Sequence, residues 1–207
     1  MQKIVEQSKK TAITRQNILD AAEAEFAKNG LAAARVDAIA RRAGVNKQMI
    51  YIHYQSKENL YSVVLQTVYR RLSQYEDILA NSSFTGIDTI RKIILEYFEF
   101  LLNNPSFVRL VLWENLNNAD YAGNVHTTLF SGAKKLLCEG VNRGVFRGDL
   151  DIEQTVISLN LFCFSAFSNI KTVSKLMRRD IGTREELLKR AEHIADVLIK
   201  YILYRED

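Results

Sequence analysis

Four side chains between residues 46 and 51 have the chemistry needed to read DNA. Asn46, Lys47 and Gln48 carry hydrogen-bond donors and acceptors that suit the edges of base pairs in the major groove. Tyr51 follows one helical turn further along. On a helix that begins near Asn46, all four would lie in the first turns, where a recognition helix meets bases and phosphates.

The residues around this segment can form a helix-turn-helix. That motif needs a small residue where its helices cross, a turn residue that tolerates positive φ, and apolar anchors on both helices. Ala40 and Gly44 have the required types and spacing, and the anchors are Ile39, Val45 and Ile50. The sequence therefore predicts short helices over about 36–42 and 46–54. An ordinary helical hairpin with solvated polar ends is the alternative.

The positive charge is concentrated in the same part of the chain. Residues 1–57 contain ten lysines and arginines but five acidic residues, a net charge of +5. The remaining residues contain 18 basic and 19 acidic side chains and carry −1. A basic module joined to a nearly neutral body is expected of a protein that neutralises phosphates with one end. A solvated basic tail would give the same charge. The positive charge favours DNA binding only because it lies in the same segment as the motif.

Apolar residues recur at helical spacing along most of the chain. They predict further helices over about 14–28, 56–72, 88–102, 105 onward, 121–142, 152–175 and 183–202. Predicted N-caps are Ser56, Asp151 and Thr183. One proline and nine glycines leave few turns for a β-rich fold. We therefore expect an all-α fold of about nine helices. The absence of a signal sequence and of an apolar run of about 20 residues predicts a soluble, cytoplasmic protein.

The segment from Gly30 to Tyr61 resembles the DNA-binding signature of the TetR family. It contains an Ile-Ala pair, Ala-Gly-Val at the turn, a tyrosine followed by an aromatic residue, and then Ser-Lys-Glu and Leu. The resemblance covers roughly residues 12–72. It implies a three-helix DNA-binding domain over 12–72, with its motif at 35–54, and a larger helical ligand-binding and dimerisation domain over 73–207.

The resemblance also implies roles for single residues. Tyr51 matches the tyrosine that packs on and hydrogen-bonds the phosphate backbone. Lys57 matches the lysine that meets a phosphate at the start of the next helix, where backbone N–H groups also point outward. Lys47 and Gln48 match positions that usually face bases. His53 matches a position that often touches phosphate, and packing against the hairpin is its alternative role.

Two positions depart from the family pattern. Arg35 stands where a serine or threonine most often caps the second helix, so a cap is lost and a phosphate or minor-groove contact is gained. Tyr54 replaces the commoner phenylalanine and adds a hydroxyl group that needs a partner. Before the motif, Lys3, Lys9 and Lys10 form an arm that either follows the minor groove or is disordered.

Aromatic residues beyond residue 72 could line a small-molecule site. Such sites combine apolar and aromatic surface with a few polar groups, although core packing is the alternative role for each residue. The candidates are Tyr97, Phe98, Phe107, Trp113, His126, Cys163, Phe164 and Phe167. No cofactor and no metal ion are expected.

The resemblance further implies that the last two helices pair with their copies in a homodimer. Such an interface is two-fold symmetric, and two recognition helices then read a palindrome. The expected function is that of a transcriptional repressor that a small-molecule ligand releases from a palindromic operator. We expect the ligand to act by tilting the helix that begins at Ser56.

An enzyme is the main alternative from another functional class. His53, His126 and His193 have no metal-ligand spacing, and Cys138 and Cys163 lack a local basic partner. The sequence also contains no glycine-rich phosphate loop and no nucleophile motif. We therefore expect a protein that is not an enzyme. A ligand-independent regulator, an activator of the same fold or a nucleoid-type binder is the second alternative.

Overall fold

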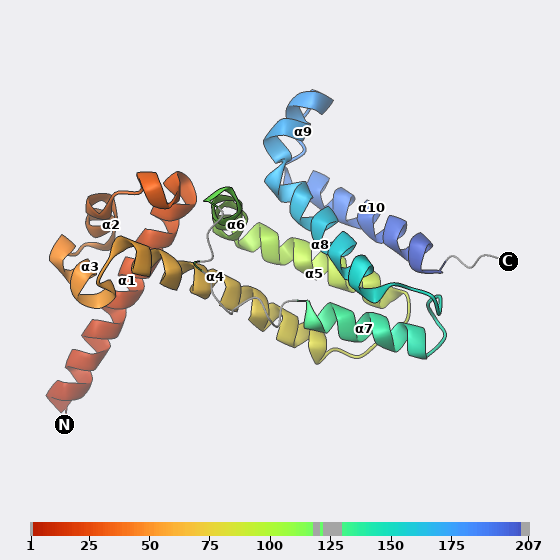
Figure 1. Ribbon diagram of the computed structural model, residues 1–207, viewed down its shortest axis with the longest axis horizontal. Helices are drawn as coiled ribbons and strands as arrows, with labels where there is room; N and C mark the ends of the chain where they lie inside the picture. The colour runs from red at the N-terminus through yellow and green to blue at the C-terminus, as the bar shows by residue number, and fades with distance from the viewer. Residues whose placement is uncertain (1, 118–120, 122–129, 204–207) are drawn as a thin grey trace. The chain divides into compact units, whose positions relative to one another are not determined.

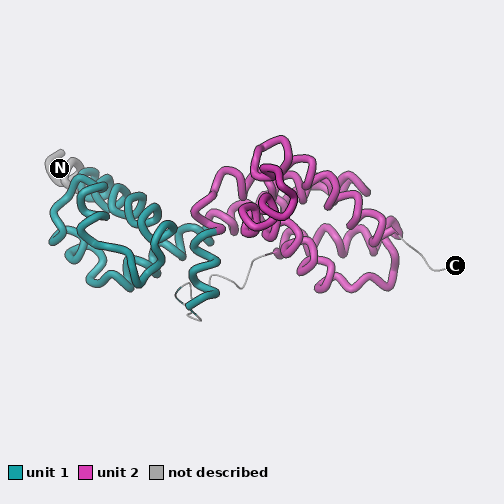
Figure 2. The backbone as a smooth tube through the Cα atoms, turned by 90° about the horizontal axis from the view of Figure 1, so that it is seen from above, with its two compact units in different colours: residues 1–70, 109–126 teal, residues 71–108, 127–207 magenta. Residues whose placement is uncertain are grey.

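The computed structural model describes residues 2–117, 121 and 130–203, with side chains from residue 9 onward. These residues form ten α-helices and contain no β-strand (Figure 1), which confirms the predicted all-α fold. The chain divides into unit 1, residues 1–70 and 109–126, and unit 2, residues 71–108 and 127–207 (Figure 2). The boundaries fall within α4 (Lys57–Ala80) and α6 (Pro105–Asn117). The functional division predicted at residue 72 stays a prediction.

Unit 1 is built on α1 (Gln2–Ala33), α2 (Val36–Ala43) and α3 (Lys47–Tyr54), together with the first half of α4. The predicted apolar stripe of α1 forms its core, since Ile18, Ala22 and Phe26 are fully buried. The ring of Phe26 meets that of Tyr61 from α4 edge-on, with centroids 5.0 Å apart. Ser56 caps α4 as predicted, because its Oγ accepts the backbone N–H of Asn59 at 3.0 Å.

Helix α1 is longer than the sequence pattern indicated. It begins at Gln2, so the segment with Lys3, Lys9 and Lys10 is helical rather than disordered, and its contact with the minor groove stays a prediction. Residues 2–29 contain no glycine or proline to interrupt a helix. Gly30, the predicted end, has a φ of 68° and a ψ of 176° and marks a kink within α1.

Unit 2 contains α5 (Asp88–Asn103), α7 (Ser131–Asn142), α8 (Ile152–Ser168), α9 (Ile170–Met177) and α10 (Arg184–Leu203). Helix α5 packs against α8 and α10, and α7 packs against α8. The predicted caps are present: the side chain of Asp151 accepts the N–H of Gln154, and that of Thr183 accepts the N–H of Glu186. The helix predicted over 121–142 is described from Ser131 as α7, and most of its earlier part lies outside the described residues.

The single helix predicted over 152–175 was wrong, because the chain bends by 72° between α8 and α9. Asn169 stands at the break, and its Nδ2 donates to Ser168 Oγ at 3.0 Å and to the carbonyl of Ser165 at 3.4 Å. Such local side-chain bonds compete with the helix and favour its end. Among the described helices, none alone is long and apolar enough to span a membrane, and α8 and α9 pass that test only as a bent pair.

Candidate nucleic-acid interface

Gly44 allows the chain to turn from α2 into α3. It adopts a left-handed conformation, with φ 67° and ψ 31°, which a residue without a side chain reaches most easily. Ala40 is buried in the second half of α2, and its carbonyl accepts the N–H of Val45 at 3.0 Å. Ile39 and Ile50 anchor the two helices and are buried. The predicted helix-turn-helix is therefore present in unit 1.

Asn46 fixes the position at which α3 begins. Its side-chain oxygen accepts the backbone N–H of Gln48 at 3.0 Å, so this oxygen caps the helix. Lys47 and Gln48 consequently lie in the first turn, and both are exposed. Tyr51 is one turn further along and is 41% exposed. The residues expected to read DNA thus share the exposed start of one helix.

An open hollow of about 660 Å³ lies beside the start of α3. It is lined by Ala34, Arg35, Val36, Asp37, Lys47, Tyr51, Gln55, Ser56, Lys57 and Glu58. Four predicted DNA-binding residues, three cationic and one phenolic, therefore surround one space. The hollow also contains the start of α4, where backbone N–H groups and the positive end of the helix dipole favour an anion. The carboxylates of Asp37 and Glu58 also line the hollow, so an anion there would meet three cations and two acidic groups.

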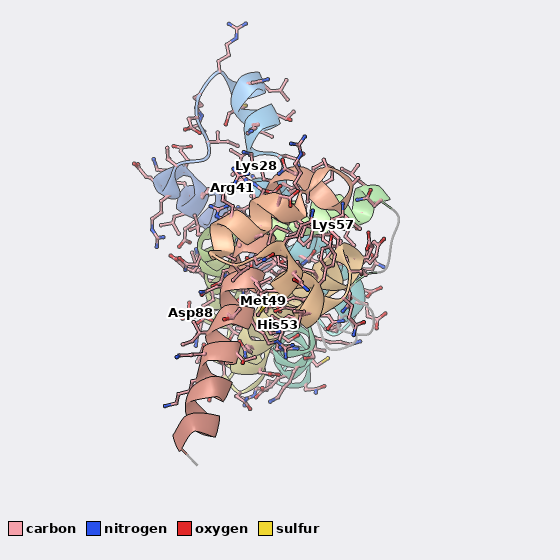
Figure 3. The ribbon with its side chains drawn as sticks, turned by 90° about the vertical axis from the view of Figure 1, so that its left-hand side faces the viewer. Lys28, Arg41, Met49, His53, Lys57 and Asp88 are labelled. Atoms are coloured by element: carbon pink, nitrogen blue, oxygen red, sulfur yellow. The ribbon has the colours of Figure 1, made fainter. Side chains whose placement is uncertain are left out.

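Both lysines of the hollow contact other groups of unit 1. The Lys57 ammonium donates to the carbonyls of Ala32 and Ala34 at 3.3 and 3.4 Å. Lys57, which is labelled in Figure 3, therefore also ties the start of α4 to the end of α1. Lys47 Nζ lies 2.9 Å from a carboxylate oxygen of Asp37 on α2. A hydrogen bond to Asp37, and the charge of that carboxylate, raise the pKa of Lys47, so the lysine remains a cation.

His53 and Arg35 were also predicted to contact DNA, and their surroundings differ from those of the two lysines. His53 has its Nε2 buried and without a hydrogen-bond partner in the described part of the chain, which agrees better with packing than with a phosphate contact. The side chain of Arg35 makes no capping bond to α2, as expected from the loss of serine or threonine there. Its backbone N–H instead donates to Glu25 Oε1 at 3.1 Å, and its side chain is exposed.

Two contacts of this module were not predicted from the sequence. Asp37 pairs with Lys47 across the turn, ten positions away, at a spacing that no helical periodicity marks. The hydroxyl of Tyr54, for which a partner was expected, donates to the carbonyl of Arg15 at 3.0 Å. The guanidinium of Arg15 also lies over the same ring, 5.8 Å from its centroid. The hydroxyl group of Tyr54 was the only signal in the sequence, and it indicated a partner for Tyr54 but not the pair of Asp37 and Lys47.

Six of the predicted ligand-binding residues lie in unit 2. Tyr97 is buried, and its hydroxyl accepts a hydrogen bond from Asn160 Nδ2 at 3.0 Å. Its ring stacks on that of Tyr75, with centroids 6.1 Å apart. Burial raises the pKa of the Cys163 thiol to about 12, so this thiol stays protonated. The remaining members of the set are Phe98 and Phe107, which are buried, and Phe164 and Phe167, which are partly exposed.

Trp113 belongs to unit 1, whereas the six residues named above belong to unit 2. Its indole nitrogen donates to the carbonyl of Ala27 at 3.4 Å, and its ring faces Gly30. The chain passes into unit 1 after Val108, and the assignment of Trp113 to a ligand site stays a prediction. His126 lies outside the described residues.

The sequence matches two known protein families over most of its length. Residues 18–64 match the family of bacterial regulatory proteins called tetR, and residues 87–198 match the tetracyclin repressor-like C-terminal domain. The chain belongs to the TetR family. It is therefore a transcriptional regulator with a DNA-binding helix-turn-helix, and not an enzyme.

TetR-family relatives extend over nearly the whole chain. The transcriptional repressor NicS of Pseudomonas putida is 26% identical over 90% of this chain and 91% of its own length. The repressor SCO4008 of Streptomyces coelicolor is 30% identical over 88% of this chain and 95% of its own. Among solved structures, FadR of Bacillus subtilis in complex with stearoyl-CoA aligns with a TM-score of 0.68 and 18% identity. That alignment covers 89% of this chain and 97% of FadR. This structural likeness supports the same all-helical TetR fold.

Proposed function

We propose that this TetR-family regulator is a homodimeric repressor that reads a palindromic operator with α3. Lys47 and Gln48 face base edges, whereas Tyr51 and Lys57 contact phosphates that flank them. The observation that carries the proposal is the hollow in which Arg35, Lys47, Tyr51 and Lys57 surround the start of α4. Contacts to phosphate set the register of a protein on DNA, and contacts to bases provide the preference for sequence.

The same hollow explains why the two kinds of contact can be made together. Lys57 lies at the first position of α4, and Lys47 and Gln48 lie in the first turn of α3. A phosphate beside α4 would therefore leave the exposed start of α3 directed toward the adjoining groove. Asn46 contributes through its cap on α3, and Arg35 adds a further cation at the rim. We place His53 in the packing of the module.

An exposed apolar surface on α8 and α10 supports the homodimer. Ile157, Leu161 and Phe162 on α8 are 48%, 58% and 39% exposed, and Val197 and Tyr201 on α10 are 43% and 46% exposed. Large apolar side chains gathered on two neighbouring helices are typical of an interaction surface. We propose that α8 and α10 pair with their copies about a two-fold axis, which gives two recognition helices for the two halves of a palindrome.

A small-molecule ligand is the proposed signal that releases the operator. NicS is named a repressor, and FadR of Bacillus subtilis has been crystallised with stearoyl-CoA. We propose that residues 12–72 bind DNA, and that residues 73–207 bind the ligand and form the dimer in the cytoplasm. The aromatic residues around Tyr97, with Asn160 as a polar partner, are the proposed ligand contacts. Phe98, Phe107, Cys163, Phe164 and Phe167 complete this set.

Selection from a random DNA pool tests the proposal. We expect the wild-type protein to enrich a palindrome whose half-sites are one or a few helical turns apart, and to sediment as a dimer. Leu161→Glu on α8 should give monomers and weaken operator binding. Ile78→Glu is the matched control, because Ile78 is 65% exposed on α4. Failure to enrich any sequence, or an intact dimer in Leu161→Glu, would contradict the proposal.

A further inference from the structure

The carboxylate of Asp37 is an unexpected group on a surface that should bind phosphate. It lies in the first turn of α2 and lines the same hollow as Lys47, Tyr51 and Lys57. Its distance to Lys47 Nζ is 2.9 Å. The Asp37 side chain is 67% exposed and that of Lys47 is 46% exposed, so both groups can be approached from solvent.

A pair this exposed contributes little to the stability of the fold. Exposed ion pairs typically stabilise a protein only slightly, because water screens the charges and two long side chains must be held in place. Lys47 can also leave Asp37 easily and bind another acceptor. The position of Asp37 in the hollow, rather than the strength of the ion pair, therefore indicates what this carboxylate does.

The carboxylate acts on any phosphate that enters the hollow. A phosphate in the hollow is attracted by Arg35, Lys47 and Lys57 and repelled by Asp37 and Glu58. Of the two carboxylates, Asp37 is the one paired with Lys47, so the phosphate and Asp37 compete for that lysine. This repulsion is present whatever the DNA sequence, because every phosphate carries the same charge. A base edge carries no net charge and is not opposed in this way.

We propose that Asp37 is a specificity-determining residue, which holds Lys47 away from DNA phosphates and so weakens binding to sequences outside the operator. The proposal rests on the proposed function, since it takes α3 as the reading helix. On a non-operator sequence, Lys47 stays with Asp37 and the carboxylate repels the backbone. On the operator, Lys47 gains an acceptor on a base edge, which offsets the loss of its partner.

Asp37→Asn tests this role, because it removes the charge and keeps the size of the side chain. We expect the affinity for random-sequence DNA to rise about fivefold, as expected for the removal of one nearby charge in water. The affinity for the operator should change less, so the ratio of the two affinities falls. The salt dependence on random DNA should steepen by about 0.9, since Lys47 is released to meet one more phosphate.

Two variants serve as controls. Asp20→Asn makes the same change of net charge on the exposed surface of α1, where Asp20 accepts a hydrogen bond from Gln16 rather than from a cation. It should leave the affinity ratio unchanged. In the double variant Asp37→Asn with Lys47→Ala, the steeper salt dependence should disappear, because the released lysine is absent.

The outcomes separate this inference from the proposed function. If the wild-type protein prefers no sequence, the proposed function fails. Suppose that an operator is found but Asp37→Asn raises the affinities for operator and random-sequence DNA equally. The role proposed for Asp37 is then wrong, and it is also wrong if Asp37→Asn changes these affinities no more than Asp20→Asn does. A selective loss of operator affinity in Asp37→Asn would also overturn it, because the carboxylate would then contact the operator itself.

Discussion

The indole ring of Trp113 on α6 covers the α carbon of Gly30 at the kink of α1. A Cβ atom at position 30 would lie 2.8 Å from Cδ2 of that ring. The indole nitrogen also donates to the carbonyl of Ala27, one turn before the kink. The absence of a side chain at Gly30 is therefore required twice, for its φ of 68° and for the close approach of the ring.

A comparison of two glycines separates these requirements. Gly44 also has a positive φ, of 67°, but no atom lies within 4 Å of a Cβ built on it. We expect Gly44→Ala to lower the free energy of unfolding by about 1 to 2 kcal/mol, the cost of left-handed backbone alone. Gly30→Ala should cost about 1 to 3 kcal/mol more, because the ring must also move. Urea unfolding measures both, and equal losses would contradict the close contact.

Tyr54 and Tyr51 should have opposite effects when each loses its hydroxyl group. The Tyr54 hydroxyl bonds to the carbonyl of Arg15, so Tyr54→Phe should lower the free energy of unfolding by about 1 kcal/mol. Its DNA affinity should remain unchanged. Tyr51→Phe, at an exposed position, should leave stability intact and weaken DNA binding. Thermal unfolding and fluorescence anisotropy give the two readouts, and the reverse pattern would exchange the roles assigned to the two tyrosines.

Glu76 should make the stability of the protein depend on pH. Its carboxylate is 3% exposed, and burial raises its pKa from 4.5 to about 6, although the N–H of Gly132 donates to it. The folded protein therefore holds this proton more tightly than the unfolded chain does. The stability that protonation contributes is present below pH 4.5 and is lost as the pH rises through 6.

Glu76→Gln should remove this dependence. Relative to that variant, the wild-type protein should lose about 2 kcal/mol of unfolding free energy between pH 4 and 7, from a shift of about 1.5 pKa units. Glu58→Gln, at an exposed position on the same helix, is the control and should change little with pH. Parallel curves for wild type and Glu76→Gln would show that the carboxyl titrates normally in the folded protein.

Lys57→Ala should weaken binding to every DNA sequence. The proposed partner of this lysine is a phosphate, so its loss should reduce the salt dependence of log K by about 0.9 without changing the preferred sequence. Because Lys57 also donates to Ala32 and Ala34, a small loss of stability should accompany the change. Lys200→Ala, at an exposed position on α10, is the control. An unchanged salt dependence in Lys57→Ala would show that Lys57 does not contact a phosphate.

Local patterns predicted most of the fold. The stripe of Ile18, Ala22 and Phe26, the turn at Gly44 and the cap at Ser56 each depend on residues within a few positions, and all three are present. The bend at Asn169 was missed, because apolar residues recur at helical spacing on both sides of it, at Phe167, Ile170 and Val173. The side-chain bonds of Asn169 that compete with the helix leave no mark in this spacing.

Contacts between distant segments could not be predicted in the same way. The place of Trp113 over Gly30 depends on how α6 packs on α1, and the pair of Asp37 and Lys47 depends on the crossing of α2 and α3. Residue type and spacing indicated that α3 could read DNA. They gave no indication that one of its cations faces a carboxylate.

The most direct test of the central claim is a comparison of the sequences selected by the wild-type protein and by Lys47→Ala and Gln48→Ala. If α3 reads the operator, each substitution should relax or change the preferred base pairs at one or two symmetric positions. Each should cost about 1 to 3 kcal/mol of discrimination there. The rest of the site should keep its preference. Selection of the same site with the same affinity by all three proteins would show that α3 is not the reading helix.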